Sequence, residues 1–476
     1  MNAITASQSV ALLKRTCRAR PGRTILSCLW LAPFLAGVNA AAEPSFYLRQ
    51  GDRVCFYGDS ITEQRFYGVD VETYVRTRFP HLRVDFVNSG VGGDRVTGGW
   101  AGKIDERLQR DVFSFKPNVV TIMLGMNDGG YHAFNQGTFQ TYSNGYEHII
   151  ASLQKHLPDV RIVLIEPTPY DDVSFPPKFP GGYNGVLLRY ATFVRQLAAE
   201  HNLQYVDFMT PLVDVLQQAA KEDPKLAHEV IPDRIHPSPV GELVMAQSLL
   251  QAWNAPSTVS AVTIDAARNA VVRSDNTRIS RLTAADGKIS WTQKDECLPF
   301  PILGLHEDWP QFPPTENKAW GKPFFFWPAP RPGWNYTNAA AELIVNTCRF
   351  YQALDQEPLR VAGLQAGKYQ LKINGQLIGE FSDRQLDDTI DLASYRTPML
   401  EQSCQVLALV WKQVQWRYFA WRDIQLRLED DHDRKVQKAA SSLIAALEAQ
   451  KEKDAEQQYV AAEPQPVYCE VVRVAN

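Results

Sequence analysis

Four short polar motifs follow one another in the first half of the chain. They are "GDS", "NSGVGGDR", "GMNDGG" and "IPDRIHPS", and they contain Ser60, Gly93, Asn127 and the pair Asp233 and His236. A serine hydroxyl attacks a carbonyl carbon only when a neighbouring base takes its proton. A histidine can accept and return that proton near neutral pH, and a carboxylate can hold its tautomer. The residue types therefore suit acyl transfer through a serine nucleophile.

The spacing assigns a role to each of these side chains. Asp233 lies three residues before His236 in a turn between Pro232 and Pro237, so its carboxylate can reach one nitrogen of the imidazole. The other nitrogen is then available to Ser60. We expect Ser60 to be the nucleophile, His236 the base and Asp233 the residue that orients the base.

Attack on an ester also creates an oxyanion, which needs hydrogen-bond donors placed in advance. The backbone amides of Ser60 and Gly93 and the side-chain amide of Asn127 would supply three donors. A glycine at position 93 lets the backbone approach the substrate closely.

These motifs need a scaffold that brings them together, and the pattern from Asp52 to Asn254 predicts one. Short apolar runs alternate with longer amphipathic runs, which indicates a parallel sheet with helices on both faces. Polar residues that follow such strands gather at one edge of the sheet, where α/β proteins place their sites. The predicted strands are Val54–Tyr57, Val84–Asn88, Val119–Leu124, Arg161–Ile165 and Gln204–Val206, and the predicted helices are Val71–Phe79, Trp100–Val112, Tyr142–Leu157, Leu187–His201 and Val240–Trp253.

As a set, the four motifs resemble those of the SGNH hydrolases, also called GDSL esterases and lipases. The resemblance covers about Asp52 to Trp253 and implies a flavodoxin-like three-layer α/β/α fold. It places the catalytic serine at Ser60, the oxyanion donors at Ser60, Gly93 and Asn127, and the Asp-His pair at Asp233 and His236. The first motif has isoleucine where the family's namesake has leucine. Gly93 is preferred because it precedes Asp94 as in the family pattern, and Gly90 is the alternative.

Further polar residues crowd the same predicted edge. We expect them to fix the loops through hydrogen bonds, with direct substrate contact as a second possibility for Arg95 and His132. They are Asp59, Asp94, Arg95, Asp128 and His132.

Two other functions were weighed against the serine esterase. A binuclear metallophosphatase would need several His and Asp ligands, but no histidine stands between Asn127 and Asp128 and no Gly-His-x-His follows. No metal or cofactor is therefore expected. A catalytically inactive carbohydrate-binding protein is suggested by aromatic residues between Trp309 and Tyr336, although aromatic side chains more often fill a core.

The pattern changes after residue 255. Alternating stretches and Asn374-Gly375 between two such stretches predict a small β-rich domain with a tight hairpin, carrying an ordered aromatic-rich loop from Trp309 to Tyr336.

Helical spacing resumes at Thr397-Pro398, and a charged helix with an apolar strip at Ala439, Leu443 and Leu447 is expected from Asp431 to Ala455. The last residues read as a loose tail. The predicted divisions are 1–40 signal peptide, 45–255 catalytic domain, 256–396 β-rich domain, and 397–476 helices and tail.

Basic residues before the apolar run Ile25–Val38 and small residues after it predict an export signal that is cut after Ala40. We therefore expect a secreted or periplasmic protein that has no membrane segment once the signal is removed.

Of the remaining cysteines, Cys55 should be a buried apolar residue, and a disulfide among the other four is permitted. A formal net charge of -4 gives no electrostatic signature of nucleic-acid binding.

The loops of the predicted site are rich in glycine and contain no long apolar run, from Gly90 to Gly102 or from Gly125 to Phe134. Each buried methylene contributes about 0.8 kcal/mol, so long acyl chains need extended apolar grooves. We therefore expect small acyl groups on a polar carrier, with acetylated carbohydrate first and a general short-chain arylesterase or lipase as the alternative.

Overall fold

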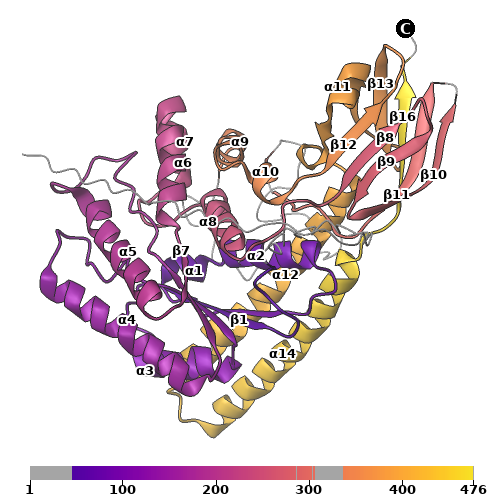
Figure 1. Ribbon diagram of the computed structural model, residues 1–476. Coiled ribbons are helices and arrows are strands. Elements are labelled where there is room, and N and C mark those ends of the chain that lie inside the picture. The colour runs from indigo at the N-terminus through magenta and orange to yellow at the C-terminus, as the bar shows by residue number, and fades with distance from the viewer. Residues whose placement is uncertain (1–44, 286, 303, 306–335, 475–476) are drawn as a thin grey trace, which may run out of the picture. The chain divides into compact units, whose positions relative to one another are not determined.

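A five-stranded parallel sheet forms the centre of the first half of the chain in the computed structural model (Figure 1). The structure describes residues 45–285, 287–302, 304–305 and 336–474. The strand order is β2-β1-β5-β6-β7, which is a doubly wound order. All five strands are parallel, but the side of the sheet to which the chain adds strands changes after β2, so β1 and β5 flank the switch point. The strands are β1 (Arg53–Gly58), β2 (Asp85–Asn88), β5 (Val119–Met123), β6 (Arg161–Ile165) and β7 (Gln204–Val206). The α/β prediction is confirmed, and every predicted strand ends within one residue of the observed one.

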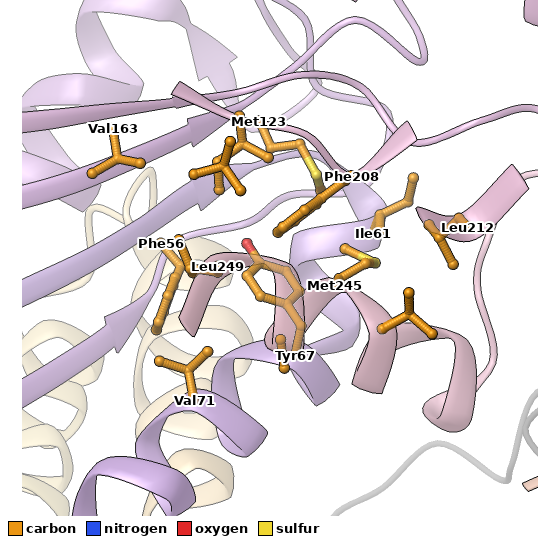
Figure 2. Packing of buried hydrophobic residues seen from close by; sticks show 14 of the residues in the cluster. Phe56, Ile61, Tyr67, Val71, Met123, Val163, Phe208, Leu212, Met245 and Leu249 are labelled. Atoms are coloured by element: carbon orange, nitrogen blue, oxygen red, sulfur yellow. The ribbon is translucent and has the colours of Figure 1, made fainter. Parts of the chain in front are cut away.

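Helices cover both faces of this sheet (Figure 1). On one face, Tyr67 of α2 packs edge-on against Phe56 of β1 and Phe208, with ring centroids 5.5 and 5.8 Å apart, and Met245 and Leu249 of α8 lie beside it (Figure 2). All five side chains are buried. The helices of this half are α1 (Ser60–Gln64), α2 (Phe66–Arg78), α3 (Ile104–Arg107), α4 (Gln136–His156), α5 (Gly182–Glu200), α6 (Met209–Glu222), α7 (Pro224–Val230) and α8 (Pro239–Ala252), with a π-helix η1 (Leu108–Val112) and a 3-10 turn η2 (Phe113–Phe115) after α3.

The predicted helix from Trp100 to Val112 is wrong over its first four residues. Residues 98–103 instead form a small hairpin of β3 (Gly98–Gly99) and β4 (Gly102–Lys103). Helix α3 begins only at Ile104, where the Glu106 carboxylate accepts the Lys103 N–H at 2.8 Å. The glycines at both ends of this hairpin are the local signal against a helix.

The region after residue 255 contains two further sheets and long helices (Figure 1). The sheets have the orders β10-β11-β16-β13-β14 and β15-β12-β8-β9. The predicted hairpin at Asn374-Gly375 is confirmed, because both residues have positive φ and join β13 to β14. The strands are β8 (Ala261–Asp265), β9 (Ala270–Asp275), β10 (Thr277–Ala285), β11 (Lys288–Asp295), β12 (Pro358–Ala362), β13 (Lys368–Ile373), β14 (Gln376–Ser382), β15 (Ile390–Asp391) and β16 (Val467–Arg473). The helical segments are α9 (Asn338–Thr347), α10 (Phe350–Leu354), α11 (Asp383–Asp388), η3 (Leu392–Ser394), α12 (Pro398–Tyr418), η4 (Phe419–Gln425), α13 (Leu426–Leu428) and α14 (Arg434–Ala462).

The prediction of a loose C-terminal tail is wrong. Strand β16 lies between β11 and β13 and pairs antiparallel with both. The charged helix expected from Asp431 to Ala455 is confirmed as α14, but its apolar strip is not the buried face: Ala439 and Leu443 are exposed and Leu447 is half-buried, while Asp454 and Gln458 are buried. The described residues after position 44 belong to one compact unit, and the predicted divisions within it stay predictions.

Helices α12 and α14 pack beside β2, the edge strand of the parallel sheet. The Arg417 guanidinium donates to the Phe86 carbonyl at 3.2 Å, and the Val84 N–H donates to the Tyr459 hydroxyl at 3.2 Å. These contacts satisfy backbone groups that an open edge would leave exposed. They also bring the end of α12 close to the loop that follows β2.

The aromatic-rich loop predicted from Trp309 onward lies outside the described residues, as does the predicted signal segment.

All cysteines within the described part are free thiols, so the permitted disulfide among the last four of them is not formed; they are Cys55, Cys297, Cys348, Cys404 and Cys469. Cys55 is buried, as expected. Among the described residues no helix is both long enough and apolar enough to cross a bilayer.

Candidate active site

Ser60 is placed by the turn that leaves β1. Asp59 caps helix α1 by accepting the Ile61 N–H at 3.0 Å, and Ile61 is buried in the core below it. Ser60 is therefore the first residue of α1, and its side chain is only partly buried at the carboxyl end of the sheet. Its backbone N–H belongs to the first turn, which has no acceptor within the helix itself.

The structure brings Ser60, His236 and Asp233 into one hydrogen-bonded chain. The Ser60 Oγ and His236 Nε2 atoms are 2.7 Å apart, and His236 Nδ1 is 2.7 Å from a carboxylate oxygen of Asp233. The other Asp233 oxygen accepts the backbone N–H groups of Ile235 and His236 at 3.0 and 2.8 Å. With Nδ1 donating to Asp233, Nε2 is left to accept the serine proton.

The same turn determines the charge of Asp233. Partial burial acts to raise the pKa of this carboxyl, but the hydrogen bonds and charge of His236 outweigh it and lower the pKa to about 2. Asp233 is therefore ionised at neutral pH, which suits a residue that orients a neighbouring imidazole.

The loop after β2 distinguishes the two candidate glycines. Gly93 has φ +79°, and its α-carbon faces open space, with no heavy atom within 4 Å of the place where a Cβ would stand. Its N–H has no hydrogen-bond partner in the part of the chain that the structure describes. The Gly90 N–H instead donates to Asn88 at 3.0 Å, and a Cβ on Gly90 would lie 2.4 Å from the Glu63 nitrogen. The geometry favours Gly93 as the donor and gives Gly90 a packing role.

Asn127 follows β5, and both the nitrogen and the oxygen of its side-chain amide form hydrogen bonds. Its Nδ2 donates to the Asp94 carbonyl at 3.1 Å and makes a long contact of 3.4 Å with Asp59, and its Oδ1 accepts the Tyr131 hydroxyl at 2.8 Å. The amide donor therefore faces the segment that contains Gly93. Only the weak contact with Asp59 would need to give way to an incoming oxyanion.

The other predicted residues have mainly structural contacts. Arg95 donates to the Asn127 carbonyl at 3.2 Å, and Asp128 accepts the Val96 N–H at 2.9 Å, so both tie the third motif to the second. Asp94 pairs with buried Arg107 at 2.7 Å. His132 is exposed, and its Nδ1 lies 2.7 Å from the Ala133 carbonyl oxygen; the substrate contact proposed for it stays a prediction.

Burial changes the acid strength of two of these carboxyls. It raises the pKa of both Asp59 and Asp128 to about 7, although backbone N–H donors act in the opposite direction. In the described residues no group of three or more His, Cys, Asp or Glu side chains is arranged to hold a metal ion.

The region that contains these motifs is similar to known proteins. Residues 56–243 match the model of the GDSL-like lipase/acylhydrolase family. The chain contains a GDSL hydrolase domain. All four motifs described above lie within the matched residues.

Relatives with related sequences or structures include two named enzymes. An acetylxylan esterase of Geobacillus stearothermophilus is 27% identical over 220 residues, covering 42% of this chain and 93% of the esterase. The solved structure of a gut microbial diltiazem-metabolizing enzyme has 25% identity and a TM-score of 0.72, and the match covers 90% of this chain and 98% of that one. That likeness extends well past the GDSL domain. A crystal structure of the Geobacillus esterase aligns with 22% identity and a TM-score of 0.36, over 44% of this chain and 97% of its own.

Several residues beside the GDSL motifs were missed by the sequence argument. Tyr131 contacts the Asn127 side chain, Glu63 accepts the Gly92 N–H at 2.8 Å, and the Trp100 indole donates to the Gly92 carbonyl at 2.8 Å. Glu63 lies one helical turn after Ser60, and that spacing was the available signal. Nothing local marked Trp100, which had been assigned to a helix.

Proposed function

We propose that the protein is a serine esterase that removes small acyl groups, acetyl first, from carbohydrate. The observation that carries the serine mechanism is the continuous chain from Ser60 through His236 to Asp233, with both contacts at 2.7 Å. A serine hydroxyl so close to an imidazole, itself oriented by a carboxylate, is the arrangement that nucleophilic catalysis needs.

In the proposed reaction Ser60 Oγ attacks the ester carbonyl while His236 Nε2 takes its proton. The carbonyl oxygen becomes an oxyanion that accepts hydrogen bonds from the N–H groups of Ser60 and Gly93 and from the Asn127 amide. His236 then gives the proton to the leaving alcohol, and the acyl group remains on Ser60. Water, deprotonated by His236, attacks this acyl-enzyme and restores the serine.

Two observations support a small acyl group on a polar carrier. The loop after β2 is rich in glycine and small residues and contains no continuous apolar run of the kind that a groove for a long acyl chain needs. The relative from Geobacillus stearothermophilus is an acetylxylan esterase whose length is almost fully covered by the match. A general short-chain arylesterase or lipase is the alternative, and the diltiazem-metabolizing relative makes diltiazem a further compound to test.

The assay should separate mechanism from substrate. We expect acetate release from acetylated xylan or pectin, and faster hydrolysis of acetyl than of decanoyl nitrophenyl ester. Ser60→Ala should lower kcat by several orders of magnitude, by analogy with about 10⁶ in another serine hydrolase, and should abolish labelling by a serine-directed phosphonate. A folded Ser60→Ala protein that keeps most of its esterase activity would contradict the serine mechanism. Preference for the decanoyl ester with no acetate from any polysaccharide would contradict only the substrate.

Export stays a proposal that a separate measurement can check. The N-terminal sequence of the protein recovered from the periplasm or medium of an expressing bacterium should begin just after Ala40, where the small residues follow the apolar run. An uncleaved N-terminus in the cytoplasmic fraction would contradict it.

A further inference from the structure

The end of helix α12 reaches the loop that carries Gly93. After Tyr418 the helix continues as the π-helix η4, Phe419–Gln425. π-helical turns are uncommon and often occur at functional sites. Trp421 of η4 and Leu426, which follows it, pack against Val91 and Ala101. A small apolar cluster therefore joins the end of η4, the loop after β2 and the β3–β4 hairpin.

Glu63 connects this segment to the loop by hydrogen bonds. One of its carboxylate oxygens accepts the Gly92 N–H at 2.8 Å. The other accepts both the Tyr418 hydroxyl and the Arg422 Nε, each at 3.0 Å. The side chains of Glu63 and Arg422 are only 11% and 19% exposed, so water competes little with this ion pair. Glu63 lies on α1, one turn after Ser60, and therefore links the nucleophile's helix, the loop and the C-terminal region.

Trp100 binds the carbonyl group of Gly92, whose N–H group is bound by Glu63. Its indole N–H donates to the Gly92 carbonyl at 2.8 Å, and the Arg422 guanidinium lies over its ring at 4.1 Å. Both backbone polar groups of Gly92 are thus bound by side chains that Arg422 contacts. The ring face of an indole attracts a guanidinium electrostatically.

A second set of contacts reaches Asp94, the residue that follows Gly93 in the chain. The Trp421 indole donates to Asp111 at 2.6 Å, Asp111 pairs with buried Arg107, and Arg107 donates to the Asp94 carboxylate at 2.7 Å. The two neighbours of Gly93 in the chain are therefore both tied to η4, by independent routes. The Gly93 N–H lies between them.

We infer that Tyr418 and Arg422 are positioning residues for ester hydrolysis, acting through Glu63 and Trp100 to hold Gly92 and so aim the Gly93 N–H at the oxyanion. This inference rests on the proposed function, because it needs an oxyanion at that place. It gives the region beyond the GDSL domain a part in catalysis. Donors of this kind act mainly in the transition state, so disturbing their position lowers kcat and leaves KM nearly unchanged.

The main test replaces Arg422 by methionine, which keeps the stem but removes the guanidinium. Misplacement of a catalytic group by about 1 Å can cost about 10²-fold, so Arg422→Met should lower kcat for the acetyl nitrophenyl ester about 10- to 100-fold, with KM within about twofold. The rate of phosphonate labelling should fall in parallel. Arg422→Lys, which keeps a cation for Glu63, should recover part of the loss.

The matched control is Glu456→Gln. It breaks the ion pair of 2.8 Å between Arg83 and Glu456 of α14, another contact between the C-terminal helices and the GDSL domain. Neither residue touches the loop, so kcat should stay within about twofold of the parent. An equal drop in the control would overturn the inference, because any loosening of the C-terminal helices would then have the same effect.

Further outcomes decide between the two proposals. Unchanged kcat in Arg422→Met, together with an inactive Ser60→Ala, overturns this inference alone, whereas an active Ser60→Ala overturns the proposed function. If Arg422→Met does not fold, Tyr418→Phe decides, since it removes one hydroxyl at nearly constant volume. We expect a fall in kcat of about threefold or more, and unchanged kcat in that variant overturns the inference.

Discussion

At the scale of single residues, the site depends on side chains that are held before any substrate arrives. The Asn127 amide is fixed by Asp94, Asp59 and Tyr131, and the Asp233 carboxylate is fixed by the backbone of its own turn. Groups placed in this way need little reorganisation during the reaction, since only the long Asn127–Asp59 contact has to give way, and preorganised donors are a large source of transition-state stabilisation in acyl transfer.

Asn127→Ala tests the oxyanion donor. We expect kcat to fall about 10²- to 10³-fold while KM changes little, because the amide acts chiefly on the transition state. Steady-state kinetics on the acetyl nitrophenyl ester measure both constants. A rise in KM at constant kcat would instead make Asn127 a substrate-binding residue.

The pH dependence of the reaction follows from the charge of the Asp-His pair. The base must be neutral to accept the serine proton, so kcat/KM should be low in acid, where His236 is protonated, and high in mild alkali. Because the pKa of Asp233 is lowered to about 2, its ionised form is present throughout the assay range and adds no inflection above about pH 4. A profile with its maximum near pH 4 would point to carboxylate chemistry and contradict a histidine base.

At the scale of elements, the C-terminal helices are joined to each other by buried polar groups. Lys412 of α12 donates to Asp454 of α14 at 2.9 Å, and the Asp454 side chain is completely buried. Next to this pair, Gln458 of α14 accepts a hydrogen bond of 2.9 Å from Arg76 of α2. Removing one partner of such a pair leaves an uncompensated charge in the interior.

Lys412→Met should therefore destabilise the protein by about 3 kcal/mol or more, as measured by the free energy of unfolding in urea. The double variant Lys412→Met, Asp454→Leu should recover much of the loss, since an apolar pair costs no charge burial. Lys294→Met serves as the control, because its pair with Glu463 is 3.6 Å long and both side chains are exposed by more than two fifths. That change should cost less than about 1 kcal/mol. Equal losses in the two single variants would contradict the argument.

At the scale of the whole molecule, the last strand completes a sheet begun almost two hundred residues earlier. Strand β16 supplies hydrogen-bond partners to residues 288–293 of β11 on one side and to residues 369–373 of β13 on the other. Its buried residues Val467, Cys469 and Val471 also join the apolar cluster that contains Trp291. Without β16, two strands would face each other with their edges unpaired.

A chain ending at Pro466 should consequently fail to form the five-stranded antiparallel sheet. We expect rapid proteolytic cleavage between residues 277 and 295 and a lower yield of soluble protein, with removal of only residues 475 and 476 as the control. A shortened chain with the same circular dichroism and protease resistance as the parent would contradict the expectation.

Local patterns in the sequence determined the GDSL half of the molecule and the contents of its candidate site. Continuous apolar runs such as Val119–Met123 are typical of strands buried on both faces of a parallel sheet, and parallel strands bring the motifs that follow them to one edge. That reasoning was sufficient to predict that Ser60 and His236 would meet although 176 residues separate them.

Only the tertiary structure decided the rest, because the deciding contacts have no local pattern. The strand at Val467–Arg473 follows a long charged helix and its pairing partners lie far away in the sequence, so it read as a tail until β11 and β13 provided those partners. Glu63 and Arg422 lie 359 residues apart, and each looks like an ordinary surface charge in its own segment. Their pairing exists because α12 covers the β2 edge of the sheet, a packing choice made by the folded chain as a whole.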